Sequence, residues 1–214
     1  MFLNCPETHT PSAAGQYDRL YATGELLWPA RPGRMVRQAM ALRDPGRVLD
    51  AGCGDGKNAL FLSDEGWTVD GFDISQLAIT ACHRRLASPH DRPCRIWVDD
   101  CRTAKLAREG YDMVVAYGLY HCLDDAGLAA THQTLIDALK SGGLFVCATF
   151  NDRLPLPPNH GTNDLYLRPH DHVESLFGGW LNVAIEKGVI EEDHRPLVGW
   201  HRHSLTWAIY EKTS

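Results

Sequence analysis

The feature that most constrains the fold is a regular alternation of short apolar segments with helical segments between residues 47 and 150. The apolar segments predict strands at 48–51, 68–72, 95–98, 113–116 and 144–148. Between them the sequence predicts helices at 58–66, 75–86 and 125–139, and Gly142-Gly143 is expected to close the last of these. This alternation is typical of a parallel sheet with helices on both faces.

The pattern differs on either side of this alternation. The N-terminal part predicts helices at 12–22 and 34–42. Segment 151–169 is rich in Pro, Asn and Gly and is longer than an ordinary connection, which is typical of a lid or binding loop. The tail predicts a short helix at 173–177 and strands at 180–186 and 204–210. We therefore expect a single domain over 1–214, with a helical cover at 1–45, a core at 46–150, and a lid loop with C-terminal strands at 151–214.

The most informative motif is the turn after the first expected strand, which reads DAGCGDGKNA at residues 50–59. Glycines let the chain bend tightly and approach a ligand closely, and the start of the next helix favours a carboxylate or phosphate. Asp73 closes the second expected strand, where an acid is placed to accept hydrogen bonds from ribose hydroxyls. Together they indicate an adenosine-containing ligand at the carboxyl edge of the sheet.

The glycine spacing separates the possible ligands. The dinucleotide fingerprint GxGxxG would place Gly or Ala where this chain has Lys57, and a phosphate-binding GK[ST] is absent. The motif and Asp73 instead resemble those of class I S-adenosylmethionine-dependent methyltransferases, over about residues 47–150. Three outer motifs are similar to those of the tellurite-resistance-type branch of small-molecule methyltransferases: Tyr17-Asp18-Arg19-Leu20-Tyr21, Gly179-Trp180 and His201-Arg202-His203.

This resemblance implies a Rossmann-like three-layer α/β sandwich with a seven-stranded, mostly parallel sheet and an antiparallel last strand. It also implies S-adenosylmethionine as cofactor and S-adenosylhomocysteine as product. An N-terminal helix with Tyr17 and Tyr21 would fold over the cofactor, with simple packing aromatics as the alternative. The cofactor-binding positions implied are Tyr17, Tyr21, Asp50, Gly52, Cys53, Gly54, Asn58, Asp73, Ile74, Asp99, Asp100, Cys101 and Tyr117.

The acceptor is expected beside the loops after the fourth and fifth strands. The cofactor carries an activated methyl group, so the enzyme mainly aligns the acceptor behind it, and a general base helps a hydroxyl or ammonium. His121 is the first candidate for that base because its ordinary pKa lies near neutrality; a hydrogen-bonded structural histidine is the alternative. The catalytic candidates are His121, Tyr120 and His201. The substrate-binding candidates are Tyr120, His160, Tyr166, Arg168, His201, Arg202 and His203.

These side chains meet only if the sixth strand is parallel and the seventh antiparallel, because the turn before His201 then opens on the same edge. In that case His121, His201, Arg202 and His203 converge. A pocket of His and Arg would suit an acceptor that is anionic or becomes so on deprotonation. The alternative is that His201 and His203 only cap the strand start in solvent.

The net charge and the motifs that are missing limit which acceptors and ligands the chain is expected to bind. The net charge is −6, which disfavours duplex nucleic acid. Methyltransferases that act on amide and base nitrogens carry an Asn/Asp-Pro-Pro-Tyr/Phe motif after the fourth strand. This chain has Tyr117-Gly118-Leu119-Tyr120 at that place, which disfavours such acceptors. No metal is expected, because the pairs His170-x-His172 and His201-x-His203 are more typical of surface polar residues.

Two sequence features indicate the cellular compartment of the protein. The 7 cysteines are scattered without a CxxC pair, which favours a reducing cytoplasm. No apolar run is long enough for a membrane span, and the first residues do not read as a secretory signal. The sequence thus predicts a cytoplasmic protein without a membrane partner.

The predicted function is S-adenosylmethionine-dependent methyl transfer to a small molecule. The sequence does not distinguish a thiol or metalloid acceptor from a heterocyclic nitrogen or a hydroxyl. A non-catalytic S-adenosylmethionine-binding sensor or partner subunit is the alternative, because cofactor binding alone does not prove turnover. An NAD-linked oxidoreductase is disfavoured by Lys57.

Overall fold

The computed structural model describes residues 13–22, 31–86, 93–157, 165–194 and 198–213, and its strands form one seven-stranded sheet. The strand order is β3-β2-β1-β4-β5-β7-β6. The parallel strands are β1 (Arg47–Ala51), β2 (Thr68–Asp73), β3 (Cys94–Val98), β4 (Tyr111–Tyr117) and β5 (Leu139–Phe150). Strand β7 (Val198–Glu211) runs antiparallel to both β5 and β6 (Leu181–His194). This topology confirms the predicted fold class.

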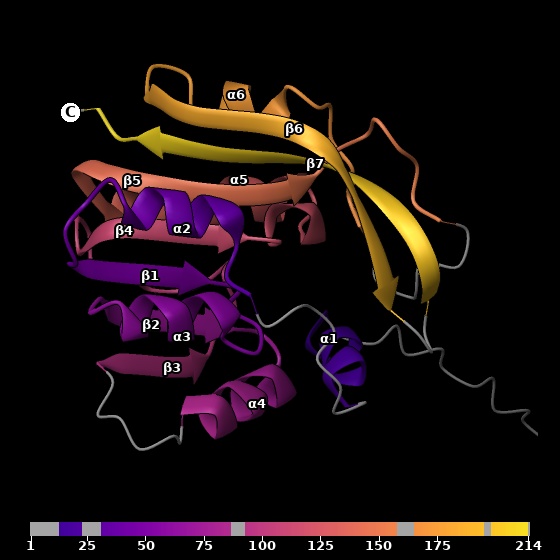
Figure 1. Cartoon of the computed structure of the whole chain (residues 1–214), viewed down its shortest axis with the longest axis horizontal. Coiled ribbons are helices and arrows are strands. Elements are labelled where there is room, and N and C mark those ends of the chain that lie inside the picture. The colour runs from indigo at the N-terminus through magenta and orange to yellow at the C-terminus, as the bar shows by residue number, and fades with distance from the viewer. Residues whose placement is uncertain (1–12, 23–30, 87–92, 158–164, 195–197, 214) are drawn as a thin grey trace, which may run out of the picture.

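Helices cover both faces of the sheet (Figure 1). One face carries α2 (Arg34–Met40), α3 (Lys57–Asp64) and α4 (Gln76–Leu86), and the other carries α5 (Asp125–Ala138) and α6 (His172–Leu176). Along β1, Val48 packs with the first group while its neighbour Leu49 packs with the second. Burial on both faces explains why the parallel strands read as continuous apolar runs. Among the described residues, no helix has the length and apolar character needed to cross a membrane.

Two segments lie over the edge where the parallel strands end. Helix α1 (Ala13–Tyr21) lies beyond the carboxyl ends of the strands, and the β6–β7 hairpin projects past the sheet and bends over the same edge (Figure 1). The register explains the projection, because the last residue of β5, Phe150, pairs with Leu205. Strands β6 and β7 continue to pair with each other beyond that point, as far as His194 and Val198.

Two expectations about element boundaries are corrected. Helix α5 ends at Ala138, and Gly142 and Gly143 lie inside β5, where the register against β4 is irregular. The strands expected at 180–186 and 204–210 are segments of two strands of 14 residues each. The outer halves of these strands are rich in charged residues and histidine, so they lack the apolar pattern of a strand. They are extended because β6 and β7 pair with each other there.

Candidate active site

The turn between β1 and α3 takes backbone conformations that glycine adopts readily. Gly52, Gly54 and Gly56 have φ values of 69°, 56° and 85°. The N–H groups of Gly52 and Cys53 donate to the carbonyl of Phe72 at 2.8 and 3.0 Å. The turn is therefore held against the end of β2, and these two N–H groups are already used. The turn therefore cannot bind an anion through the N–H groups of Gly52 and Cys53. Its glycines would instead let a ligand come close to the backbone.

Asp73 closes β2 beside this turn. Its Oδ2 accepts the N–H of Gly54 and its Oδ1 accepts the N–H of Ser75, both at 2.9 Å. One hydrogen bond on each oxygen fixes the plane of the carboxylate and leaves a further lone pair on each oxygen. Burial raises the pKa of Asp73, while the two backbone donors oppose the shift. The carboxylate is thus oriented to accept a pair of hydroxyl groups.

Asp73→Ala is expected to weaken S-adenosylmethionine binding by about 1–3 kcal/mol, or about 5- to 150-fold in Kd, because two charge-assisted hydrogen bonds are lost. Titration calorimetry measures the affinity. Asp112→Ala is the matched control, since this aspartate bonds the N–H of Arg47 and the Nζ of Lys140 and is not part of this site. An unchanged affinity in Asp73→Ala would remove Asp73 from the site.

Asp50 lies buried at the end of β1, next to the glycine turn. Its side chain is 1% exposed, and its Oδ2 has no hydrogen-bond partner among the described residues. Burial raises its pKa to about 7, although the charge of Lys57 and the N–H of Ala59 favour the ionised form. A carboxyl group that titrates near neutrality beside a ligand-binding turn is typical of a functional site.

The raised pKa of Asp50 predicts a specific pH dependence of stability. Between about pH 4 and pH 7 the folded chain keeps a proton on Asp50 that the unfolded chain has released. The free energy of unfolding should therefore fall as the pH rises, by up to about 4 kcal/mol. In Asp50→Asn this contribution is expected to be absent. Urea unfolding from pH 4 to pH 8 measures it, and parallel stability curves for the two proteins would contradict the prediction.

Helix α1 is anchored over the cofactor side of the edge. The Oδ1 of Asp18 accepts hydrogen bonds from the Oγ of Ser75 at 2.6 Å and from the N–H of Leu77 at 3.2 Å. These contacts hold the middle of α1 at the N-terminus of α4, close to Asp73. Tyr17 and Tyr21 are four residues apart, about one helical turn. They therefore lie on the same face of α1, the face toward the carboxyl edge of the sheet.

Both tyrosines are placed at this edge. Tyr17 shares a hydrogen bond with the thiol of Cys122, and the hydroxyl of Tyr21 lies where a Cβ on Gly54 would be only 2.6 Å away. Burial raises the pKa of each tyrosine, and the charge of Asp73 adds to the shift. They therefore stay neutral hydroxyls near neutral pH, and they lie beside Asp73 and the glycine turn as the sequence predicts.

Residues 99–101 follow β3 next to Asp73. Arg102 binds both carboxylate oxygens of Asp100, with a shortest contact of 2.6 Å, and this hydrogen bonding lowers the pKa of Asp100. Asp99 accepts the indole N–H of Trp97 at 3.2 Å and the N–H of Asp100 at 2.9 Å. Asp99 is thus the acid of this pair that keeps acceptor capacity. The oxygens of Asp100 serve Arg102, and its role at the cofactor stays a prediction.

Asn58 and Tyr117, both expected at the cofactor, instead hold the start of α2. The Oδ1 of Asn58 accepts the N–H of Gly33 at 2.8 Å, and the side chain is 4% exposed. The ring of Tyr117 packs so closely that a Cβ on Gly33 would lie 2.4 Å from it. Both side chains are thus used in contacts between secondary-structure elements, and a role at the cofactor stays a prediction for each of them.

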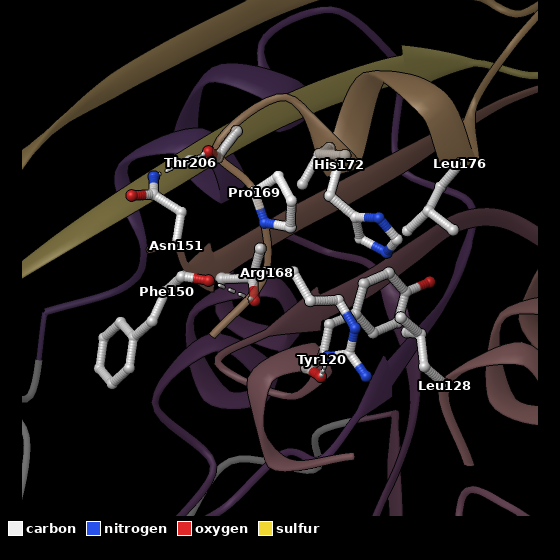
Figure 2. A pocket seen from close by; sticks show the side chains of 11 residues that line it. Tyr120, Leu128, Phe150, Asn151, Arg168, Pro169, His172, Leu176 and Thr206 are labelled. Atoms are coloured by element: carbon white, nitrogen blue, oxygen red, sulfur yellow. Dashed lines mark hydrogen bonds between the residues drawn. The ribbon is translucent and has the colours of Figure 1, made fainter. Parts of the chain in front are cut away.

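Figure 2 shows a small pocket between Tyr120, the loop after β5 and helix α6. Tyr120 is 2% exposed and its hydroxyl bonds the Nδ1 of His132 at 2.9 Å. Arg168 donates to the carbonyl oxygens of Tyr120 at 3.1 Å and Leu123 at 2.7 Å. Both side chains expected at the acceptor are therefore held by the protein itself. None of the residues that line this pocket belongs to the glycine turn or to β2, so it is distinct from the cofactor side of the edge.

A stack of three rings lies at the end of β5. The rings of His121 and Phe150 have centroids 3.9 Å apart, and those of Phe150 and His203 are 4.0 Å apart, and the rings of each pair are nearly parallel. His201 meets His203 edge-on at 4.7 Å. All three histidines are buried. The burial corrects the expectation that His201-x-His203 is a surface pair. The strand directions confirm the conditional prediction that β6 and β7 are joined at the carboxyl edge of the sheet.

Other expected acceptor residues do not join this stack. Successive side chains on a strand point to opposite faces, so Arg202 lies on the outer face of the hairpin, with 61% of its side chain exposed and Glu191 4.0 Å away. Tyr166 is exposed, and its N–H donates to the carbonyl of His121 at 2.8 Å. His160 lies outside the described residues.

The ring nitrogens of His121 and His201 have different capacities. The Nδ1 of His121 accepts the N–H of Phe150 at 3.1 Å, so the neutral ring carries its proton on Nε2 and that atom is a donor. The Nδ1 of His201 lies 2.6 Å from the carbonyl oxygen of Gly199. A carbonyl only accepts, so Nδ1 carries the proton and Nε2 carries the lone pair. The geometry therefore favours His201 over His121 as a base, which corrects the order expected from the sequence.

Comparison with known proteins finds relatives that are described as methyltransferases. Residues 48–143 match the family described as "Methyltransferase domain". The chain is 37% identical to Hemagglutinin 1 of Eikenella corrodens over 154 residues, covering 72% of this chain and 50% of that protein. It is 27% identical to the probable S-adenosyl-L-methionine-dependent methyltransferase TehB of Haemophilus influenzae, over 57% of this chain and 43% of TehB. The chain spans half or less of the length of these curated relatives.

Two solved structures share the fold. The crystal structure of TehB from Haemophilus influenzae superimposes with a TM-score of 0.74 at 18% identity, covering 85% of this chain and 62% of that one. The structure described as "Conversion of a Disulfide Bond into a Thioacetal Group during Echinomycin Biosynthesis" gives a TM-score of 0.74 at 22% identity, covering 94% and 93%. At these identities the likeness shows the fold alone.

Proposed function

Because the chain carries a class I S-adenosylmethionine-dependent methyltransferase domain similar to TehB, we propose that it methylates a small molecule that is anionic or becomes so on deprotonation. One observation carries the proposal. The glycine turn with Asp73 and the buried stack of His121, Phe150 and His203 lie at the same edge of the sheet. A methyl donor and an acceptor can therefore meet there.

The cofactor side uses groups already oriented by the backbone. Asp73 accepts the ribose hydroxyls, and Asp99 accepts the adenine amino group. Tyr17 and Tyr21 cover the cofactor from α1. The histidines at the end of β5 lie at the same edge and would form the acceptor side of the site. Positioning of this kind supplies much of the rate of a methyl transfer.

The acceptor side supplies a donor and a base. The Nε2–H of His121 binds the anionic atom or group of the acceptor, and the Nε2 of His201 takes the acceptor's proton. S-adenosylmethionine would supply the activated methyl group and would leave as S-adenosylhomocysteine, and the acceptor's proton would stay on His201.

Charge and thiol state support a small acceptor in a reducing compartment. The net charge of −6 disfavours a nucleic-acid acceptor. No disulfide joins two of the six described cysteines, which supports the cytoplasm as the place of the reaction. Thiol or metalloid, heterocyclic nitrogen and hydroxyl acceptors all fit a donor–base pair, so the acceptor is identified by assay.

Two measurements in sequence test this function. Calorimetry should show binding of S-adenosylmethionine and S-adenosylhomocysteine and none of NAD. Release of S-adenosylhomocysteine is then measured against thiols, phenols, heterocyclic amines and metalloid oxyanions, and we expect turnover with one of these classes. Binding without turnover on any of them would favour a sensor or partner subunit, and binding of NAD would contradict the cofactor side of the proposal.

A further inference from the structure

Three metal-ligating side chains share the inner face of the β6–β7 hairpin. Glu192 and His201 are direct partners across the two strands, and His203 lies two residues further along β7 on the same face. One ligand atom from each lies within 4.8 Å of the other two. The Nε2 of His203 and the Oε2 of Glu192 are 3.8 Å apart. Small side-chain rotations would bring these atoms to the separations found around a single ion.

We propose that Glu192, His201 and His203 bind a divalent transition-metal ion, with zinc as the best match. Two imidazoles and one carboxylate are a ligand set that zinc takes in catalytic sites, where a fourth position stays open for water or substrate. The same set lacks the several oxygen ligands that calcium needs. The open position is the feature that gives this site a chemical role.

The surroundings orient the ligands as a metal site requires. The Nδ1–H of His201 donates to the carbonyl of Gly199 at 2.6 Å, which fixes the tautomer with the lone pair on Nε2. The ring of His203 is held flat against Phe150 at 4.0 Å. His201 and His203 are 9% and 2% exposed, so bulk water has little access to either ring. Each imidazole is thus held in place by a neighbour other than the metal.

The charged side chain that faces Glu192 from helix α3 is Lys57. Burial lowers the pKa of Lys57, while the charges of Asp55 and Glu192 oppose this shift, so Lys57 and Glu192 interact across the edge. A divalent ion held between Glu192 and the two histidines would compete with Lys57 for the carboxylate.

The role of the ion rests on the proposed function, but its binding does not. A metal ion at this site would hold the deprotonated atom of the acceptor beside the His121–Phe150–His203 stack. His201 would then be a ligand of the ion rather than the base. A thiolate or another soft anion would be a favoured acceptor, because zinc binds such ligands well.

Cobalt serves as the spectroscopic probe of binding. The full chain, stripped with chelator and without cofactor or acceptor, is titrated with Co²⁺, and the visible absorption of a four- or five-coordinate ion is followed. We expect one ion per chain, displaced by Zn²⁺. His201→Ala and Glu192→Gln should each weaken Co²⁺ binding at least about tenfold. The matched control is His83→Ala, an exposed histidine on α4, which should leave the affinity unchanged.

Each outcome decides between the possibilities. S-adenosylmethionine affinity and circular dichroism of each variant show that it is folded, and Glu192→Gln retains the size of the side chain if His201→Ala does not fold. No Co²⁺ binding, or equal affinity in wild type and both site variants, would overturn the metal site. Methyl transfer that persists in chelated protein would then leave the proposed function standing. Metal binding in a chain that methylates nothing would keep the site and reject the function.

Discussion

Gly54→Val is expected to weaken S-adenosylmethionine binding at least about 100-fold, through added bulk and a strained backbone at the turn. Gly54 has a φ of 56°, a conformation that disfavours a β-branched residue. A Cβ at this position would lie 2.6 Å from the hydroxyl of Tyr21, and the N–H of Gly54 orients Asp73 at 2.9 Å. The valine therefore occupies the space above the turn and disturbs the carboxylate that receives the ribose. Titration calorimetry gives the affinity directly.

Gly179→Val separates the site from general strain. Gly179 also has a positive φ, 90°, but a Cβ there meets nothing within 4 Å. We expect this variant to lose about 1–2 kcal/mol of stability and to keep its affinity for the cofactor. If both variants lost affinity to the same degree, backbone strain alone would explain the result and Gly54 would have no special place at the ligand.

His201→Ala is expected to lower turnover about 100-fold or more while the affinity for S-adenosylmethionine changes little. The reason is the Nε2 lone pair that the hydrogen bond from Nδ1 to Gly199 preserves. Neither atom belongs to the cofactor side of the site. Single-turnover rates and calorimetry on the same preparation measure the two quantities separately.

The ionisation state of the acceptor distinguishes this role from a structural one. An acceptor that is already ionised needs no base, so His201→Ala should lose little rate with it and much rate with a neutral acceptor of similar size. His121→Ala should lose rate with both acceptors, because His121 acts as a donor. His132→Ala, which removes the partner of the buried Tyr120 hydroxyl, is the control for lost stability alone. An equal loss of rate with both acceptors in His201→Ala would contradict the assignment.

The geometry of the glycine turn and of Asp73 beside it could be predicted because it is local. The glycine turn at 52–56 and Asp73 belong to consecutive elements, and Asp18 directly follows Tyr17 and lies about one helical turn before Tyr21. Asn58 belongs to the same stretch of sequence, yet it bonds Gly33, 25 residues away. No neighbouring residue signals that contact, so the sequence assigned the side chain to the ligand.

The acceptor side depends on contacts between distant segments. The separation of Arg202 from His201 and His203 follows from which face of β7 lies inward, and that is decided by the register with β5 and β6. The roles of His121 and His201 follow from the carbonyl or N–H that each Nδ1 meets. Glu192 joins the two histidines only because β6 pairs with β7 beyond the end of β5.

The sequence by itself determined the order of strands and helices, the glycine turn and the acid that faces it, because periodicity and turn chemistry act over a few residues. Only the tertiary structure decided which polar side chains meet above that turn. The side chain of Tyr120 lies in the core, whereas that of His121, the next residue, stacks on Phe150. That choice depends on burial and on hydrogen-bond partners from other strands, and these exist only once the sheet has formed.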